Sequence, residues 1–424
     1  MLKRSLALIL LLVMALTLAA GCAGPSEARE AQAPEDQKVN LWFYYPTQVG
    51  GDLSNGMEKI VADFNDSHPE INVTAVYTGS YKQTAQKAMS DLAAGNGPNV
   101  ILSGMLDILD YYNVNALEKM EPYLQQEGAE WSSDFVDGFW ENFGMADGAV
   151  YGLPFQHSVC VLYYNQDMLE AAGVKAPENW QETLEAVSAL QAFDSSVIPM
   201  EFPSDVWVLE ALTLSNSGSL IESDTKTAFD SEPVVESLDL MSRLIQGGGM
   251  INSYAAAAED FIAESCAMML NTTGNLGFVS SDAQFNWDVA MVPVNTAPKL
   301  SYGGGGLVMT ADQTEEEKAA SWEFMKYMTS PEVSARWMTI SGYFAVRKSA
   351  DELPITKEYY AERPQLQKAA KLLEYTAAQW TTKRYWDVYG YMQTALDAVL
   401  IDGKTSARDA LTTAQNEAKA ILEE

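Results

Sequence analysis

The sequence predicts an α/β protein whose folded part is divided into two lobes. Segments with strand patterns are followed repeatedly by segments with the 3.6-residue spacing of helices, which is typical of sheets covered by helices. The part from Lys38 onward, about 385 residues, exceeds what one hydrophobic core usually supports. Because no linker-like segment divides this part, the chain is expected to cross between lobes rather than form two successive domains.

Three strands and two helices are predicted first. The strands are expected at 39–45 (VNLWFYY), 71–78 (INVTAVYT) and 99–104 (NVILSG). Apolar residues with helical spacing are Met57, Ile60, Val61 and Phe64 in the first helix and Ala85, Ala88, Met89 and Leu92 in the second. The helices should end near His68-Pro69 and in AAGNGPN, respectively. Strands separated by helices in this way predict a parallel sheet with helices on its faces.

The alternation continues with different lengths. Further strands are expected at 159–165 and 287–294, helices at 179–193 and 314–328, and a helix running into a strand at 260–270. Asn179, with Glu182 three residues later, is a predicted helix cap, and Ser330 is expected to cap a helix that begins at Pro331. The last 40 residues have a helical pattern.

Residues 1–21 have the features of a lipoprotein export signal. A positively charged start precedes an apolar stretch, and small residues stand directly before Cys22. The stretch is too short and wrongly flanked for a membrane-spanning helix. The alternative is an ordinary secretory signal, because lipoprotein signals usually have Leu where Ala19 stands. In either case the folded part is expected outside the cytoplasm, and the lipoprotein hypothesis anchors it to the cell membrane through Cys22.

The chain after the signal is polar at first and acidic throughout. Residues 22–37 contain prolines and charged residues but no large apolar side chain, which predicts a flexible tether. The formal net charge is −32, and it becomes −34 once Lys3 and Arg4 are removed with the signal. A surface this acidic repels nucleic acid and anionic lipid, so no nucleic-acid partner is expected.

Cys160 and Cys266 both lie in apolar runs. They are expected to be buried free thiols rather than a disulfide, because a chain of this size does not need a covalent staple.

The sequence lacks the familiar catalytic and metal motifs. His68 and His157 are far apart, and there is no HExxH, no clustered Cys/His spacing and no GxSxG. GKT at 403–405 is not a phosphate loop, since Ala398 stands where the motif requires glycine. We therefore expect no catalytic residue, no metal and no cofactor. A secreted glycosidase stays open as an alternative, because its two carboxylates would not stand out among 58 acidic residues.

Seven stretches, in order along the chain, resemble one protein family. They are FNDSHPEINV (64–73), LAAGNGPNVI (92–101), YGLPFQHSVCVLYYNQDMLEAAGV (151–174), CAMML (266–270), YGGGGLVM (302–309), WEFMKYMTSPEVSARWMTISGYFAVRKSA (322–350) and DGKTSARDAL (402–411). The chain resembles the extracellular solute-binding proteins of bacterial ABC importers, specifically the carbohydrate type that includes maltose-binding and glycerol-3-phosphate-binding proteins.

The resemblance implies a two-lobed periplasmic-binding-protein-like fold with discontinuous lobes and ligand in the cleft. The N-lobe would comprise residues 38–153 and 299–343, and the C-lobe residues 154–298 and 344–424. The chain would cross between them near Leu153-Pro154, Asn295–Ser301 and Ser341–Val346. Each crossing contains Pro or Gly, which suits a hinge.

The resemblance also places ten residues near the ligand: Tyr81, Asp107, His157, Ser158, Trp207, Thr273, Gly305, Tyr343, Lys383 and Arg384. Tyr343 and Gly305 belong to general hinge and core patterns of the family. Where glycerol-3-phosphate-binding relatives have a ligand-binding glutamate, this chain has Met105, so either Asp107 substitutes from a shifted loop or the ligand differs. Lys383 and Arg384 would hold a phosphate, a carboxylate or a sugar hydroxyl, or form a surface salt bridge.

The preferred ligand is a neutral sugar or oligosaccharide, with a glycerol phosphate ester as the close alternative. The expected partners are this small molecule and the membrane subunits of an ABC permease, and the protein is expected to be monomeric. Ligand presentation to a sensor protein is an alternative that the sequence does not separate from transport.

Overall fold

The computed structural model describes residues 38–47, 52–105, 107–136, 139–140, 143–145, 148–377 and 382–423. The predicted export signal (1–21), the tether (22–37) and the lipidation site Cys22 lie outside the described residues. Val39–Glu424 form one compact unit.

Most strands belong to one mixed sheet. The strands are β1 (Val39–Tyr45), β2 (Ile71–Tyr77), β3 (Val100–Gly104), β4 (Leu153–Asn165), β5 (Glu201–Phe202), β6 (Ile221–Ser223), β7 (Lys226–Thr227), β8 (Met250–Ile251), β9 (Met268–Thr272), β10 (Trp287–Met291), β11 (Leu300–Met309) and β12 (Thr376–Ala377). The order in the sheet is β2-β1-β3-β11-β4-β9-β5-β8, with β10 paired to β4 and β12 to β11, while β6 and β7 pair separately.

The helices surround this sheet. They are α1 (Leu53–Ser67), α2 (Tyr81–Ala93), α3 (Ile108–Asn113), α4 (Glu121–Glu127), α5 (Ala129–Ser133), α6 (Gln166–Ala171), α7 (Trp180–Phe193), α8 (Val206–Ser215), α9 (Glu232–Gln246), α10 (Tyr254–Ile262), α11 (Leu276–Asp282), α12 (Glu315–Met328), α13 (Pro331–Ser341), α14 (Pro354–Glu362), α15 (Pro364–Lys371), α16 (Tyr385–Leu400) and α17 (Ala407–Leu422).

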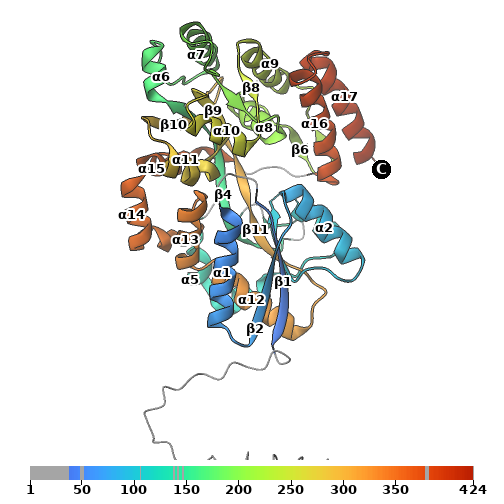
Figure 1. The fold of residues 1–424 in the computed structure, drawn as a ribbon. Coiled ribbons are helices and arrows are strands. Elements are labelled where there is room, and N and C mark those ends of the chain that lie inside the picture. The colour runs from blue at the N-terminus through green and yellow to red at the C-terminus, as the bar shows by residue number, and fades with distance from the viewer. Residues whose placement is uncertain are drawn as a thin grey trace, which may run out of the picture. The chain divides into compact units, whose positions relative to one another are not determined.

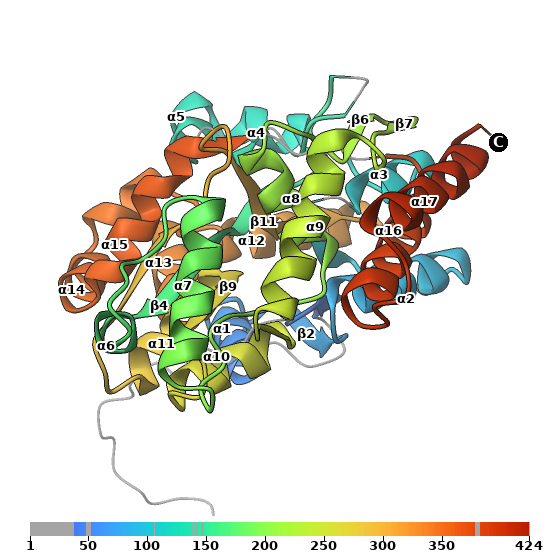
Figure 2. The ribbon, with the colours of Figure 1, turned by 90° about the horizontal axis from the view of Figure 1, so that it is seen from above.

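The elements gather around two ends of the sheet. In Figure 1, α1, α2 and α12 lie beside β1 and β2, and we call this group the N-lobe. The helices α8, α9, α16 and α17 pack together around the other end, which we call the C-lobe, and Figure 2 shows α16 and α17 beside α9. The long strands β4 and β11 pair antiparallel and run between the two groups (Figure 1).

The predicted strand and helix alternation is confirmed in the N-lobe. β1 pairs in parallel with β2 and with β3, as strand–helix–strand units require. Apolar residues of α1 at the predicted spacing, such as Met57, Ile60 and Phe64, are fully buried. The ring of Phe324 on α12 lies 5.1 Å from that of Phe64 and 5.2 Å from that of Phe43. Each such buried side chain contributes about 1.5–3 kcal/mol to folding through removal of apolar surface from water.

The predicted helix caps are also confirmed. The Asn179 side chain accepts from the backbone N–H of Glu182 at 3.0 Å, and that of Ser330 accepts from Val333 N at 3.3 Å. Pro331 occupies the first position of α13, where its missing N–H costs nothing.

Some boundaries differ from the prediction. The strand expected to begin at residue 159 begins at Leu153, and the strand expected to end at 294 ends at Met291. The helical pattern predicted near the C-terminus corresponds to two helices, α16 and α17, which are separated by residues 401–406. The strand β11 is absent from the sequence prediction, since four consecutive glycines hide its pattern.

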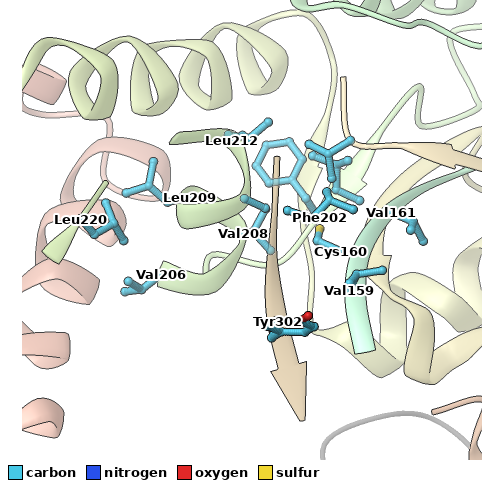
Figure 3. Packing of buried hydrophobic residues seen from close by; sticks show 14 of the residues in the cluster. Val159, Cys160, Val161, Phe202, Val206, Val208, Leu209, Leu212, Leu220 and Tyr302 are labelled. Carbon is cyan, nitrogen blue, oxygen red and sulfur yellow. The ribbon is translucent and has the colours of Figure 1, made fainter. Parts of the chain in front are cut away.

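The C-lobe core packs beneath α8. Figure 3 shows Val208 and Leu212 of α8 turned toward Phe202 and Cys160, and all four are buried in one apolar cluster. Cys160 and Cys266 are both buried free thiols, which confirms the expectation for this pair. No helix in the described part of the chain has both the length and the apolar character needed to cross a bilayer.

Candidate ligand-binding site

A cavity lies between the N-lobe and C-lobe elements. The volume open to the centre of a water molecule is about 160 Å³. Its walls come from α2 and the β3–α3 segment on one side, from α8, α10 and α16 on the other, and from β4, β9 and β11 between them. Aromatic residues dominate the lining and are Tyr81, Trp207, Phe229, Tyr254, Tyr302, Tyr343, Tyr385, Trp386 and Tyr389. Figure 3 shows Val206, Leu220 and Tyr302 of this lining beside the C-lobe core.

Tyr81 is fixed at the start of α2. Ser80 caps this helix through a reciprocal capping box with Gln83, which sets where the helix begins. The Tyr81 hydroxyl oxygen accepts a hydrogen bond from Gln156 Nε2 at 2.5 Å and donates to Tyr343. Gln156 is held in turn by Trp337, whose Nε1 donates to Oε1 at 2.8 Å. Through these hydrogen bonds Gln156 and Trp337, which do not line the cavity, hold Tyr81 and Tyr343 in place.

Asp107 closes the N-lobe side of the cavity. The residue is only 2% exposed, and its Oδ2 accepts from the backbone N–H of Gly104 at 3.2 Å. Its Oδ1 has no hydrogen-bond partner in the described part of the structure. Burial raises the pKa of Asp107 well above its usual range, while nearby Trp386 and the Gly104 N–H favour the ionised form.

Asp205 organises the C-lobe side. As the cap of α8 it accepts from Trp207 N at 2.8 Å, and its other oxygen accepts from the Tyr389 hydroxyl at 3.0 Å. Tyr254 also hydrogen-bonds to this carboxylate, whose pKa is raised by burial. The side chain therefore ties α8, α10 and α16 together at the cavity.

Trp207 stands over β11. Its Nε1 donates to the backbone oxygen of Tyr302 at 2.9 Å. A Cβ at Gly303 would come within 2.7 Å of both the Trp207 ring and Ser158 Oγ, so only glycine lets the indole lie this close to the strand. The glycine run of β11 therefore makes room for an aromatic wall.

The first five residues of α16 add three rings to the cavity. The ring centroids of Tyr385, Trp386 and Tyr389 lie 5.1–5.8 Å from one another. The buried Nε1 of Trp386 has no hydrogen-bond partner of good geometry among the described residues. Asp110 on α3 accepts from the backbone N–H groups of Arg384 and Tyr385, and burial raises its pKa to about 6. An N-lobe carboxylate thus lies at the N-terminus of α16, where the helix dipole favours negative charge.

All ionisable Asp, Glu, Lys, Arg or His side chains that line the cavity in the described part of the chain are acidic. Asp107, Asp205 and Glu210 line the cavity, whereas no Lys, Arg or His does so in the part of the chain that the structure describes. The residues left undescribed between 38 and 424 contain no basic side chain in the sequence. Among the described residues, no group of three or more His, Cys, Asp or Glu is arranged to hold a metal ion.

Five of the ten residues predicted for the site line this cavity. They are Tyr81, Asp107, Ser158, Trp207 and Tyr343. Asp107, the proposed substitute for a glutamate, lies beside Met105 in the wall.

His157, Thr273 and Gly305 lie behind the cavity wall. The ring of His157 is fully buried and stacks on Phe139 with centroids 3.8 Å apart, and burial lowers its pKa to about 3. Thr273 Oγ1 accepts from Val159 N at 3.1 Å. A Cβ at Gly305 would meet Ser103 O at 2.2 Å, so this glycine permits the close pairing of β3 and β11.

Lys383 and Arg384 line a separate groove rather than the cavity. The groove lies between α2, α3, α16 and α17, and shares Asp107 and Trp386 with the cavity. Both basic side chains are exposed, and Arg384 Nε donates to Asp387 at 2.9 Å. Arg384 therefore forms a salt bridge with Asp387, as in the salt-bridge alternative considered for this pair.

Several lining residues are absent from the sequence prediction. Asp205 directly precedes an apolar helical segment, which is the pattern of a helix cap. Tyr385, Trp386 and Tyr389 have the i, i+1, i+4 spacing of one helix face. Neither pattern signals ligand contact by itself, because caps and aromatic faces are common in protein cores.

Comparison with known proteins identifies the family of this chain. The model of the bacterial extracellular solute-binding protein family matches residues 59–368. The sn-glycerol-3-phosphate-binding periplasmic protein UgpB of Yersinia pestis bv. Antiqua (strain Antiqua) is 24% identical over 358 residues, which cover 79% of this chain and 80% of that protein.

Solved structures show the same fold. UgpB of Mycobacterium tuberculosis, in complex with glycerophosphocholine, has a TM-score of 0.81 at 21% identity, covering 91% of this chain and 98% of that one. Maltose-bound MalE3 of T. maritima has a TM-score of 0.80 at 20% identity, covering 90% and 100%. These neighbours confirm the predicted two-lobed α/β fold. The chain belongs to the family of bacterial extracellular solute-binding proteins.

Proposed function

We propose that this protein captures a carbohydrate in the cavity between its lobes and delivers it to the membrane subunits of an ABC importer. The observation that carries the proposal is the lining itself, which contains many aromatic rings together with carboxylates, hydroxyls and backbone groups. Flat rings cover the apolar C–H faces of a sugar, while the oxygen atoms accept hydrogen bonds from its hydroxyls.

The same lining argues against a glycerol phosphate ester. A buried phosphate needs cations or several N–H donors, yet carboxylates line the cavity, and no Lys, Arg or His joins them among the described residues. Lys383 and Arg384, the pair considered for a phosphate, line the adjacent groove. The relatives named above bind ligands of both kinds, so our choice of a carbohydrate rests on the cavity chemistry of this chain.

Hinge closure would couple capture to delivery. The crossing at Leu153-Pro154 coincides with the start of β4, next to a β-bulge between Gly305 and Gly306 of β11. A bulge bends a strand locally, which supports our proposal that lobe movement is centred here and at 295–301 and 341–346. Ligand shifts the population toward the closed form only by its higher affinity for that form.

We also propose that the mature protein is a monomer held at the cell membrane by lipid on Cys22. Anchoring keeps the receptor at a high local concentration near its permease. Replacing Cys22 with Ser should move the protein from the membrane fraction to the medium. An equal membrane fraction for the two proteins would refute the anchor.

Binding without turnover is part of the proposal. Incubation with labelled glycans should leave them intact while they bind reversibly and saturably. Turnover of a glycan without such binding would favour the secreted glycosidase instead.

A thermal-shift screen tests the main proposal. A ligand bound only by the folded state raises the melting temperature, so sugars, oligosaccharides and polyols should raise it, whereas sn-glycerol-3-phosphate should not. A shift with sn-glycerol-3-phosphate alone would contradict the carbohydrate assignment.

A further inference from the structure

The sequence of α16 does not cap its own N-terminus. The residue at the cap position is Arg384, whose side chain makes no capping hydrogen bond to the helix. Its φ of 53° lies in the left-handed region, which is unfavourable for a residue with a side chain. The neighbouring helices α8 and α17 are capped locally, because the side chains of Asp205 and Ser406 accept from N–H groups of the helices that they begin. The first N–H groups of α16 therefore need an acceptor from elsewhere.

Asp110 supplies that acceptor. Its carboxylate accepts from the backbone N–H groups of Arg384 and Tyr385. Asp110 and Arg384 also line the same groove, which agrees with this contact. An acidic side chain at a helix N-terminus satisfies N–H groups that have no partner within the helix and interacts favourably with the helix dipole. Asp110 thus does for α16 what Asp205 does for α8.

The cap and the capped helix belong to different lobes. Asp110 lies on α3, which follows β3, and β3 pairs with β1 of the N-lobe. The helix α16 packs on α8, α9 and α17 of the C-lobe. The contact between Asp110 and α16 therefore forms only when the lobes are together, and it does not require a ligand.

The capped end of α16 carries cavity residues. Tyr385 and Trp386 are the first two residues of this helix, and both line the cavity. Trp386 also lies close enough to Asp107, the residue before α3, to lower the pKa of its carboxyl. The contact between α3 and α16 therefore sets where these two rings lie relative to the N-lobe wall.

We propose that Asp110 is a positioning residue for ligand capture. From the N-lobe it caps the C-lobe helix α16, and in this way it holds the lobes together and keeps Tyr385 and Trp386 at the cavity. The inference rests on the proposed function, because it requires lobes that open and close around a ligand. It adds that a contact within the protein favours the closed form before a ligand binds, which raises the apparent affinity.

Closure should take up protons at Asp110. Burial raises the pKa of this carboxyl from 3.8 to about 6, and separation of the lobes would lower it again. The titratable side chains that face it are Asp107, Tyr111, Lys383, Arg384 and Asp387. In the described groove, the residues from α2 and α17 carry no titratable side chain. Because the closed form binds the proton more tightly, the contribution of this proton to closure is present at about pH 4 and is lost as the pH rises through about 6.

Three variants separate capping from charge. Asp110→Asn keeps an acceptor for α16 and resembles the neutral carboxyl, since Asn and Asp are comparable helix caps. Asp110→Ala removes the acceptor. Ser406→Ala is the matched control, because it removes a cap within one lobe, where Ser406 Oγ accepts from Asp409 N at 3.1 Å. Melting temperatures without ligand show that all three variants are folded.

Small-angle X-ray scattering without ligand measures how far the lobes separate. At about pH 5, Asp110→Ala should have a larger radius of gyration than the unmodified protein, whereas Asp110→Asn and Ser406→Ala should match it. Equal radii for Asp110→Ala and the unmodified protein would show that this contact does not hold the lobes together, and would overturn the inference.

Calorimetry measures the effect on affinity. The probe is whichever of maltose, cellobiose and ribitol gives the largest thermal shift. At the same pH, Asp110→Ala should bind it about threefold to thirtyfold more weakly, the range that loss of a helix cap covers. Ser406→Ala and Asp110→Asn should bind it within about twofold of the unmodified protein. The affinity of the unmodified protein divided by that of Asp110→Asn should fall about tenfold from about pH 4 to about pH 7.

The outcomes separate the two proposals. An affinity ratio that does not change with pH, or an Asp110→Ala variant that binds as tightly as the unmodified protein, overturns the inference and leaves the proposed function standing. If none of the three probes binds, the proposed function loses its support, whereas scattering without ligand still decides whether Asp110 holds the lobes together.

Discussion

Trp207 presents to the cavity an indole ring that the protein holds in place. The indole is fixed by its bond to the backbone oxygen of Tyr302 and lies near Tyr254, with ring centroids 6.2 Å apart. Trp207→Ala should weaken sugar binding about ten- to hundredfold, because stacking area is lost. Calorimetry measures the affinity. Trp42→Ala is the control, because this tryptophan on β1 is 52% exposed and does not line the cavity.

The outcome for Trp207 depends on stability as well as affinity. The side chain is only partly buried, so the variant should melt within about 5 °C of the unmodified protein. Unchanged affinity in a folded variant would exclude Trp207 from the site.

Gly305 was predicted to lie near the ligand, and in the structure it permits the close pairing of β3 and β11. A Cβ at this position would lie 2.2 Å from Ser103 O and 3.0 Å from Tyr81 Cε1. Gly305→Ala should lower the free energy of unfolding by about 2–4 kcal/mol, since β3 must move away from β11. Urea unfolding gives the value.

Gly390 supplies the matched control for that substitution. It lies inside α16, and an added Cβ would meet no atom within 4 Å. Gly390→Ala should raise stability by about 0.5–1 kcal/mol through helix propensity. Loss of stability at Gly390, or none at Gly305, would contradict the packing described for β11.

At the scale of elements, α3 and α16 meet through the Asp110 carboxylate and the first N–H groups of α16. Burial raises the pKa of Asp110 from 3.8 to about 6, so the folded state binds a proton more tightly than the unfolded state does. This group therefore lowers stability as the pH rises from about 4 to about 6. Asp110→Asn should abolish that contribution.

Unfolding at several pH values measures this effect. The free energy of unfolding of the unmodified protein minus that of Asp110→Asn should fall across the window from pH 4 to pH 6. A difference that is constant or rises with pH would show that the carboxyl is not buried as described.

Elements with a strong local pattern were predictable from the sequence. The strands β1 and β3, the helices α1 and α7 and the cap at Ser330 follow from apolar periodicity and capping residues. The strand β11 was not predictable in this way, because its four central glycines carry no side-chain pattern. Its conformation is imposed by pairing with β3 and β4, which are distant in sequence.

For the whole molecule, chain length and the missing linker indicated two lobes, and the order of motifs indicated the family. The candidate ligand-binding site was only partly predictable. The resemblance placed Asp107 and Trp207 near the ligand but gave no role to Asp205, Tyr302 or Trp386, which meet at the cavity because α8, β11 and α16 converge in three dimensions. Charge balance inside a cavity is likewise a property of the assembled fold, and a net charge of −32 for the chain does not reveal it.

The most direct test of the carbohydrate-binding account is a crystal structure of the protein with the sugar that gives the largest thermal shift. The account predicts that this sugar lies in the cavity between Tyr81, Trp207 and Trp386, with one of its polar groups on Asp107 Oδ1. Electron density for the sugar in the groove at Lys383 and Arg384, with the cavity left empty, would contradict it.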